Sequence, residues 1–202
     1  MRAMRDNREM RLSVPTDRRI LTVAQRLLQA HGYHGVSYAA VAAAVGLRKA
    51  SVFHHFPTKE DLARAIVAHY RATVRDGMAT IDQATDDPRD KLARYAGLYR
   101  ALLARGEHMC LCGLLAAEAT TLPESVRAEV RAYFDEHEAW LADVLTEGLT
   151  VGLLRFDGSP ADAAQRVLAG IEGALLVAQA HDDEARFDVI ANGLLADLRD
   201  DA

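Results

Sequence analysis

The side chains with the clearest chemical use in this sequence lie in residues 49–56, a predicted short helix. At about 100° per residue, Val52 and Phe56 fall on one face of this helix and can pack against a core. Lys49 stands at the helix start, where its long stem can reach outward. The opposite face carries small and polar side chains, namely Ala50, Ser51, His54 and His55. A cation followed by small residues lets a helix approach base edges closely, so this face is suited to a DNA major groove.

A second short helix and a tight turn precede these residues and would position them. Ser37 is placed to cap this helix, whose buried side includes Val41 and Val45. Gly46 ends the helix, because glycine tolerates the left-handed conformation that a tight turn needs. Two short helices joined by a Gly-containing turn make a helix-turn-helix. The alternative is an amphipathic helix pair within an ordinary bundle, since short pairs with a Gly turn are common.

The charge of the chain is unevenly distributed. The formal net charge is −5, but residues 1–60 carry ten Lys/Arg and four Asp/Glu, against fourteen and 25 in the rest. A basic first third on an acidic body is typical of a DNA-binding surface confined to one end. We expect residues 1–15 to form a disordered basic arm. This arm either adds phosphate or minor-groove contacts or is a solvated tail.

Composition limits the class of protein. Half of the 202 residues are hydrophobic, which is enough for a large core. The many Ala, Leu, Arg and Glu residues favour helices, and the few aromatics and prolines argue against a β-rich fold. No apolar run approaches the roughly 18 residues of a membrane span. We therefore expect no membrane partner and a soluble cytoplasmic protein with reduced thiols.

Residues 18–62 resemble the N-terminal domain of the TetR family of bacterial transcriptional regulators. The similarity begins with an amphipathic helix, which we expect Gly32 to end. An aromatic at Tyr33, Gly35 and the capping Ser37 follow. It continues through a buried pair and a turn, Val41-Ala42 and Gly46-Leu47. The matching residues of the recognition segment are Lys49, Ala50, Ser51, Val52, Phe53, His55, Phe56, Lys59 and Leu62.

Two positions depart from the family pattern. Arg48 stands where the family usually has a small capping residue, which puts the helix cap in doubt but adds a cation to the DNA side. Phe53 stands where the family usually has Tyr, so one hydroxyl contact to phosphate is expected to be missing. We expect Lys49 to contact base edges, with Ala50 and Ser51 beside it. We expect the DNA backbone to be contacted by Ser37, Tyr38, Ser51, His54, His55 and Lys59, and we count Arg48 among the DNA-binding residues.

The rest of the chain predicts further helices and no convincing strand, which gives an all-α protein of about nine helices. We expect three parts: the arm (residues 1–15), a three-helix helix-turn-helix DNA-binding domain (16–62), and a C-terminal helical bundle for ligand binding and dimerisation (63–202). Thr58 with Asp61, and Ser159 with Asp162, mark two helix starts. In the family, the last two helices pair with those of a second chain, so the resemblance implies a homodimer. The alternative is that their apolar faces belong only to the core of one chain.

A small-molecule site is expected in the C-terminal bundle. Aromatic residues with polar tips suit a small apolar ligand with one or two hydrogen-bonding groups, although such residues at helical spacing are also typical of a core. The candidates are Tyr95, Tyr99, Cys110, Leu114, Tyr133, His137 and Trp140. On a helix, Cys110 and Cys112 would point about 200° apart, so they are not expected to share a metal or form a disulfide. They are either small core residues, or one of them lines the pocket or reacts with an electrophile or oxidant.

No motif for catalysis is found: the sequence has no Gly-rich phosphate loop, no nucleophile elbow and no HExxH. We expect no cofactor and no metal. The sequence is interpreted as a ligand-responsive repressor that binds a palindromic double-stranded DNA operator as a homodimer and is released by a small-molecule effector. The alternatives are an activator or a ligand-independent DNA-binding protein, and then a non-DNA helical binding module or an enzyme. A salt-dependent gel shift distinguishes a DNA-binding protein from the non-DNA helical binding module and from the enzyme.

Overall fold

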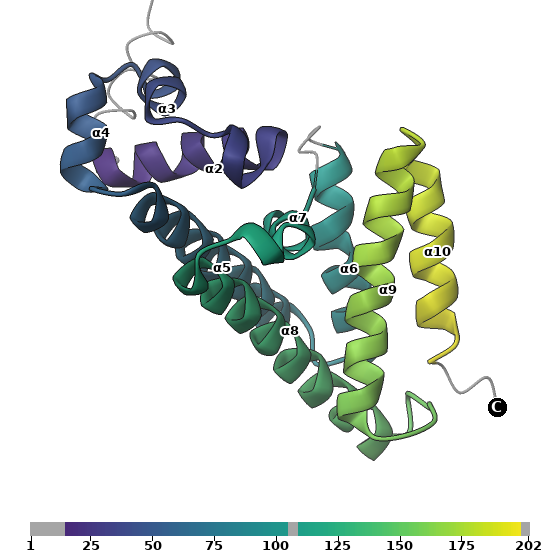
Figure 1. The fold of residues 1–202 in the computed structure, drawn as a ribbon. Helices are drawn as coiled ribbons and strands as arrows, with labels where there is room; N and C mark the ends of the chain where they lie inside the picture. Colours follow the sequence, from purple (N-terminus) through teal and green to yellow (C-terminus); the bar gives the residue numbers. More distant parts are fainter. Residues whose placement is uncertain (1–14, 105–108, 199–202) are drawn as a thin grey trace, which may run out of the picture.

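The computed structural model describes residues 15–104 and 109–198, so the predicted arm lies outside the described residues except for Pro15. Within these ranges the chain forms nine α-helices and no strand (Figure 1), which confirms the predicted all-α class. The first three helices, which we call the reading head, are α2 (Thr16–Gly35), α3 (Tyr38–Val45) and α4 (Lys49–His55). The others, which we call the body, are α5 (Lys59–Ala84), α6 (Pro88–Ala104), α7 (Leu111–Ala117), α8 (Glu124–Thr150), α9 (Pro160–Ala180) and α10 (Glu184–Ala196). A short 3-10 turn, Ala119–Thr121, follows α7.

Helices α3, α5 and α9 begin at the caps that the sequence predicts. The Ser37 hydroxyl accepts a hydrogen bond from the Ala40 N–H, and Gly46 ends α3 with φ 76° and ψ 36°. Thr58 and Asp61 form a reciprocal capping box at the start of α5, and Ser159 does the same with Asp162 before α9. The predicted helix starts are therefore confirmed, because each side chain satisfies a backbone N–H that has no partner within its helix.

Helix α2 differs from the prediction at its end. Gly32 adopts φ 69° and ψ 176°, which bends the chain sharply, but one more helical turn follows to Gly35. The kink presents the Tyr33 N–H to the body, where the Glu118 carboxylate accepts it at 2.8 Å. A contact with the body therefore takes the place of the simple helix stop that the glycine alone predicted.

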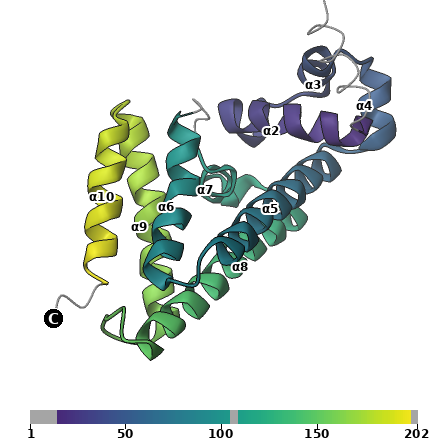
Figure 2. The same cartoon turned by 180° about the vertical axis from the view of Figure 1, so that it is seen from behind.

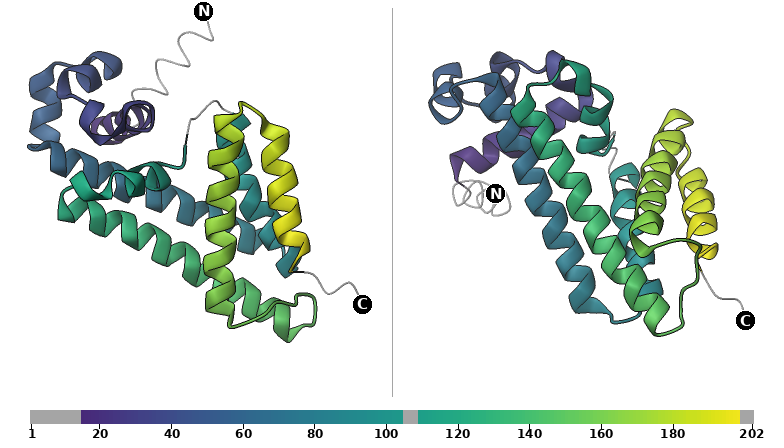
Figure 3. Two further views of the ribbon diagram at one scale, coloured as in Figure 1. Left: turned by 45° about the vertical axis from the view of Figure 1, so that its right-hand side comes forward. Right: turned by 60° about the horizontal axis from the view of Figure 1, so that its bottom comes forward.

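The arrangement of the helices separates the reading head from the last two helices. In Figure 1, α5 descends from the reading head beside α8, and the rear view in Figure 2 shows the same pairing. Helices α9 and α10 stand together on the side of the molecule away from α4, as the two views in Figure 3 also show. One continuous hydrophobic core runs through both parts of the molecule. Within the described ranges, no helix combines the length and low polarity needed to cross a lipid bilayer.

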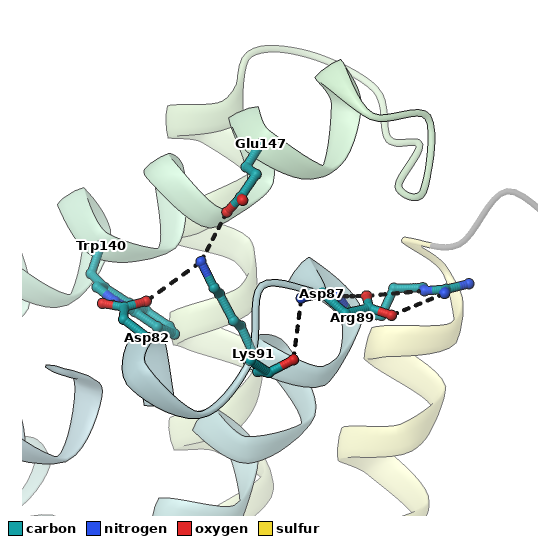
Figure 4. A network of polar contacts seen from close by, with 7 residues as sticks. Asp82, Asp87, Arg89, Lys91, Trp140 and Glu147 are labelled. Carbon is teal, nitrogen blue, oxygen red and sulfur yellow. Dashed lines mark hydrogen bonds and ion pairs between the residues drawn. The ribbon is translucent and has the colours of Figure 1, made fainter. Parts of the chain in front are cut away.

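A polar network ties the corner between α5 and α6 to α8 (Figure 4). The largely buried Lys91 ammonium lies 2.9 Å from a Glu147 oxygen and 3.7 Å from an Asp82 oxygen. The Trp140 indole N–H donates to the other Asp82 oxygen at 2.9 Å. The hydrogen bond to Glu147 raises the pKa of Lys91, so this corner holds a paired charge and fixes the lower end of α5.

Candidate nucleic-acid interface and effector cavity

Helix α4 shows its polar side to solvent and its apolar side to the core. Val52 is fully buried and Phe56 is nearly so, whereas Lys49, Ala50 and His54 are exposed. His55 is exposed as well, and Ser51 is half-buried. The helix lies at the outer edge of the reading head (Figure 1). A short helix with one buried apolar face and one exposed cationic face has the geometry required to enter a major groove.

An aromatic stack joins this helix to α3. Tyr38 stacks on Phe53, with the ring centroids 4.3 Å apart and the planes 12° apart. The Tyr38 hydroxyl donates to the Phe56 carbonyl at 2.7 Å, which satisfies the carbonyl at the end of α4. The Lys49 ammonium lies 5.8 Å from the centre of the half-exposed Phe53 ring. Tyr38 therefore has a structural role in addition to the DNA contact predicted for it.

The remaining predicted DNA-side residues have distinct surroundings. Arg48 precedes α4 in an extended conformation and makes no side-chain cap, which agrees with its departure from the family pattern. The Lys59 ammonium donates to the His34 carbonyl at 3.2 Å and lies 4.8 Å from the Tyr33 ring centre. Lys59 thus joins the start of α5 to the end of α2.

Two hydrogen bonds connect the reading head to the segment around α7. The Gln29 amide donates to the Met109 carbonyl at 2.6 Å, and the Tyr33 N–H donates to Glu118 as described above. Met109 directly precedes Cys110, which is the N-cap of α7. A movement of α7 would therefore change the hydrogen bonds at the C-terminal end of α2.

A chain of buried hydroxyl, thiol and imidazole groups lies at the other side of α7. The Tyr70 hydroxyl donates to the Cys110 sulfur at 3.8 Å, and that thiol donates to the Tyr133 hydroxyl at 3.4 Å. The chain continues through Tyr99, 3.2 Å from Tyr133. It ends where the Tyr95 hydroxyl meets the His137 Nδ1 atom at 2.7 Å. Five of the seven predicted ligand residues, Tyr95, Tyr99, Cys110, Tyr133 and His137, are thus brought together.

The two other predicted ligand residues lie apart from this chain. Trp140 stacks on the Tyr95 ring, with the centroids 5.5 Å apart, but its N–H group bonds Asp82 on the outer side. Leu114 is half-buried on α7. Their assignment to a ligand site stays a prediction.

Burial controls the protonation of this chain of groups. Loss of solvation raises the pKa of the Cys110 thiol well above its usual value, and it raises the pKa of Cys112 too. Burial also lowers the pKa of His137 to about 4, so the imidazole is neutral at pH 7. Because the reactive form of cysteine is the thiolate, the structure favours a packing role for both thiols. Cys110 caps α7 instead of lying within it, and both cysteines are free and buried.

A cavity of about 220 Å³ opens between α2 of the reading head and helices α5, α6 and α8 of the body. Tyr99 and Tyr133 are the predicted ligand residues that line it. The wall on the side of the reading head is formed by Thr22, Gln25 and Arg26 of α2, which were not predicted as ligand residues. No local signal identifies them, because polar residues on the outer face of an amphipathic helix are usually solvated. Within the described ranges, no group of three or more His, Cys, Asp or Glu side chains is arranged to hold a metal ion.

The fold and the exposed face of α4 define a helix-turn-helix protein of the DNA-binding class. Residues 20–66 match the bacterial regulatory proteins of the tetR family, and residues 88–194 match the tetracyclin repressor-like C-terminal domain. The chain belongs to the TetR family of DNA-binding transcriptional regulators. The family resemblance inferred from residues 18–62 is therefore confirmed.

Three known proteins illustrate the similarity. A TetR-family transcriptional regulator from Agrobacterium tumefaciens is 37% identical, with a TM-score of 0.88 over 91% of this chain and 97% of that chain. A TetR regulator from Legionella pneumophila is 26% identical, with a TM-score of 0.84 over 92% and 98%. The HTH-type transcriptional repressor DhaR of Mycobacterium sp. (strain GP1) is 25% identical over 164 residues, which cover 80% of this chain and 81% of DhaR.

Proposed function

We propose that this protein is a homodimeric transcriptional repressor that binds a palindromic operator and is released by a small-molecule effector. The observation that carries the proposal is the orientation of α4, with Val52 buried and Lys49 exposed at the outer edge of the reading head. The repressor direction is supported by the similarity to DhaR, an HTH-type transcriptional repressor.

Lys49 is our candidate for the base-edge contact, because it is the cation at the start of the helix that would enter the groove. Ala50 and Ser51 follow it and allow a close approach of the backbone. We assign contacts with the DNA backbone to the predicted set Ser37, Tyr38, Ser51, His54, His55 and Lys59, and we assign Arg48 to the DNA-binding surface without a specific contact. In this assignment Lys59 reaches a phosphate from the position in which it also bonds His34.

Replacing Lys49 by alanine should weaken binding to duplex DNA from upstream of the protein's own gene by about 1–3 kcal/mol, the value of a base-edge contact. Binding to a shuffled duplex should change little. A gel shift over a series of salt concentrations measures both. The control is Arg75→Ala, which removes an exposed cation from α5 of the body and should leave the affinity unchanged. Wild-type affinity in Lys49→Ala would contradict the assignment.

The dimer surface is assigned to the outer face of α9 and α10. Leu176 and Val177 of α9 are exposed, and so are Val189 and Ile190 of α10. Gly173 and Gly193 lie on the same two helices, and a Cβ atom added at either would meet no atom within 4 Å. A patch of apolar side chains beside such open positions fits the close approach of a second helix pair. A two-fold dimer would then present two copies of α4 to two half-sites.

The substitution Val189→Asp should convert the dimer into a monomer at micromolar concentration. Val189 is 74% exposed in the single chain, so the change should not affect folding, but it would bury an unpaired carboxylate in an apolar interface. Such a burial costs about 1–3 kcal/mol or more. Sedimentation equilibrium measures the shift. The matched control is Val151→Asp, because Val151 is 57% exposed in the turn after α8. If Val189→Asp and Val151→Asp dimerised equally well, the interface would have to lie elsewhere.

The proposed response to an effector uses the contacts between the reading head and the body. Gln29 and Tyr33 bond the segment around α7, and α7 is in turn joined through Cys110 to the buried tyrosines of the body. An effector that binds one arrangement of these elements better than another would change the spacing of the two reading heads. The difference in effector affinity between the two states sets the size of the response, typically about 1–3 kcal/mol.

A further inference from the structure

We propose that the cavity between α2 and the body binds a small amphipathic carboxylate, with Arg26 as the side chain that holds the carboxylate. This inference rests on the proposed function, because it names the chemical class of the effector. The cavity is bounded by the reading head on one side and by α5, α6 and α8 on the other. A ligand in this cavity would therefore contact both the reading head and the body.

The size and walls of the cavity favour a small, mainly apolar molecule. Its volume of about 220 Å³ is below the roughly 300–1,000 Å³ of pockets for drug-sized ligands. Val74, Leu98 and Leu102 line it together with the rings of tyrosines. An aliphatic or phenyl body of a few carbons fits these surfaces.

The neutral polar groups of α2 and α5 at the cavity already have partners. The Thr22 hydroxyl donates to the Arg18 carbonyl, and the Thr73 hydroxyl donates to the His69 carbonyl, both at 3.0 Å. The Gln25 amide donates to the Gln29 side chain at 3.2 Å. The two hydroxyl groups therefore have no proton left to donate to a ligand, and the Gln25 amide has one N–H left.

The tyrosines of the cavity wall are engaged in the same way. Tyr70 donates its proton to the Cys110 sulfur, and the hydroxyl groups of Tyr99 and Tyr133 are bonded to one another. Their polar ends belong to the buried chain described above. To a ligand they present mainly aromatic surface.

Arg26 is the exception among these residues. It is exposed beside the cavity, and no hydrogen bond or ion pair joins it to any residue that the structure describes. The lining residues include no aspartate or glutamate, and Arg26 is their one cation. A guanidinium has five donors in a planar fork that matches a carboxylate. A single cation over an apolar cavity thus selects a singly charged acid with an apolar body.

The first test uses linear and phenyl-substituted carboxylates of four to eight carbons, each paired with the alcohol of the same skeleton. Thermal shift finds the binders, and titration calorimetry on the full chain gives their affinities. At least one carboxylate should bind tenfold or more tightly than its alcohol. In Arg26→Gln this preference should fall at least tenfold, whereas Arg75→Gln, the charge-matched control on α5, should retain it. No binding by any carboxylate, or an unchanged preference in Arg26→Gln, would overturn the proposal.

A second pair of variants tests the location of the site. Gly77 lines the cavity, and a Cβ atom there would lie 3.6 Å from Leu98, an ordinary contact. Gly77→Leu should therefore fold, fill the cavity and weaken carboxylate binding at least tenfold. Gly97→Leu is the matched control, because Gly97 lies on exposed α6 surface with no atom within 4 Å of an added Cβ. If both variants bound the carboxylate equally weakly, or if both bound it as tightly as the wild type, the ligand would lie elsewhere.

A gel shift on the same wild-type sample separates this inference from the proposed function. Binding to upstream DNA without binding of any carboxylate would overturn the ligand class alone. Arg26-dependent carboxylate binding without any DNA binding would leave the ligand site in place and remove the repressor assignment. Release of the DNA by the carboxylate, lost in Arg26→Gln, supports both.

Discussion

Lowering the pH from 6.5 to 4 should reduce the free energy of unfolding by about 3 kcal/mol through His137 alone. Burial holds the pKa of His137 at about 4 in the folded protein, against 6.5 for an ordinary histidine. Above pH 6.5 both states are neutral at this residue and nothing is lost. Between pH 6.5 and 4 the unfolded chain binds a proton that the folded chain does not. The free energy of unfolding therefore decreases as the pH is lowered through this range. Below pH 4 the contribution of this group is constant.

Urea unfolding at several pH values, compared with His137→Gln, measures this effect. The variant should lose the extra pH dependence, so the stability difference between the two proteins should shrink by about 3 kcal/mol from pH 7 to pH 4. The comparison also cancels the carboxyl groups, including Glu172, whose pKa is raised by burial and which acts in the opposite direction. His54→Gln, which removes an exposed imidazole, is the control. Parallel pH profiles for wild type and His137→Gln would contradict the prediction.

Replacing Gly32 by alanine should destabilise the protein by at least about 2 kcal/mol and loosen the reading head. The backbone at Gly32, with φ 69° and ψ 176°, lies in a region that costs other residues about 1–3 kcal/mol. An added Cβ would also lie only 2.1 Å from a Glu118 oxygen. That carboxylate would have to move and would give up the Tyr33 N–H, and hydrogen bonds to charged groups contribute about 1.5–3 kcal/mol.

Thermal unfolding and operator affinity together test the role of Gly32. Glu118→Gln should show the smaller part of the effect, because it weakens the bond to Tyr33 without changing the backbone. Gly97→Ala, at an open helical position, should be neutral or slightly stabilising, since alanine favours helix over glycine by about 1 kcal/mol. If Gly32→Ala were as stable as wild type, the kink would have no role in holding the reading head.

Local features of the fold could be predicted because their causes lie within a few residues. Ser37, Gly46 and the Thr58–Asp61 pair act on backbone groups three or four positions away, and each lies where the prediction placed it. The family motif in residues 18–62 identified the class of protein in the same way. Short-range capping and turn chemistry therefore determined these helix boundaries.

The candidate effector site could be predicted only in part, because its partners are distant in the sequence. Arg26 reaches a cavity whose other walls come from residues 70–133. The extra turn after Gly32 depends on Glu118, 85 positions beyond Tyr33. The buried aromatic residues Tyr95, Tyr99 and Tyr133 were recognisable by helical spacing. The hydrogen bond between Tyr99 and Tyr133 required the packing of α6 against α8.

The measurement that most directly tests the account is a methylation-interference footprint on upstream DNA bound by the wild-type protein. Two major-groove patches related by two-fold symmetry, about one helical turn or a multiple of it apart, are expected. The guanines whose modification interferes should change in Lys49→Ala and stay the same in Arg75→Ala. A single unpaired patch, or a pattern indifferent to Lys49, would contradict the claim that α4 reads the groove from a symmetric dimer.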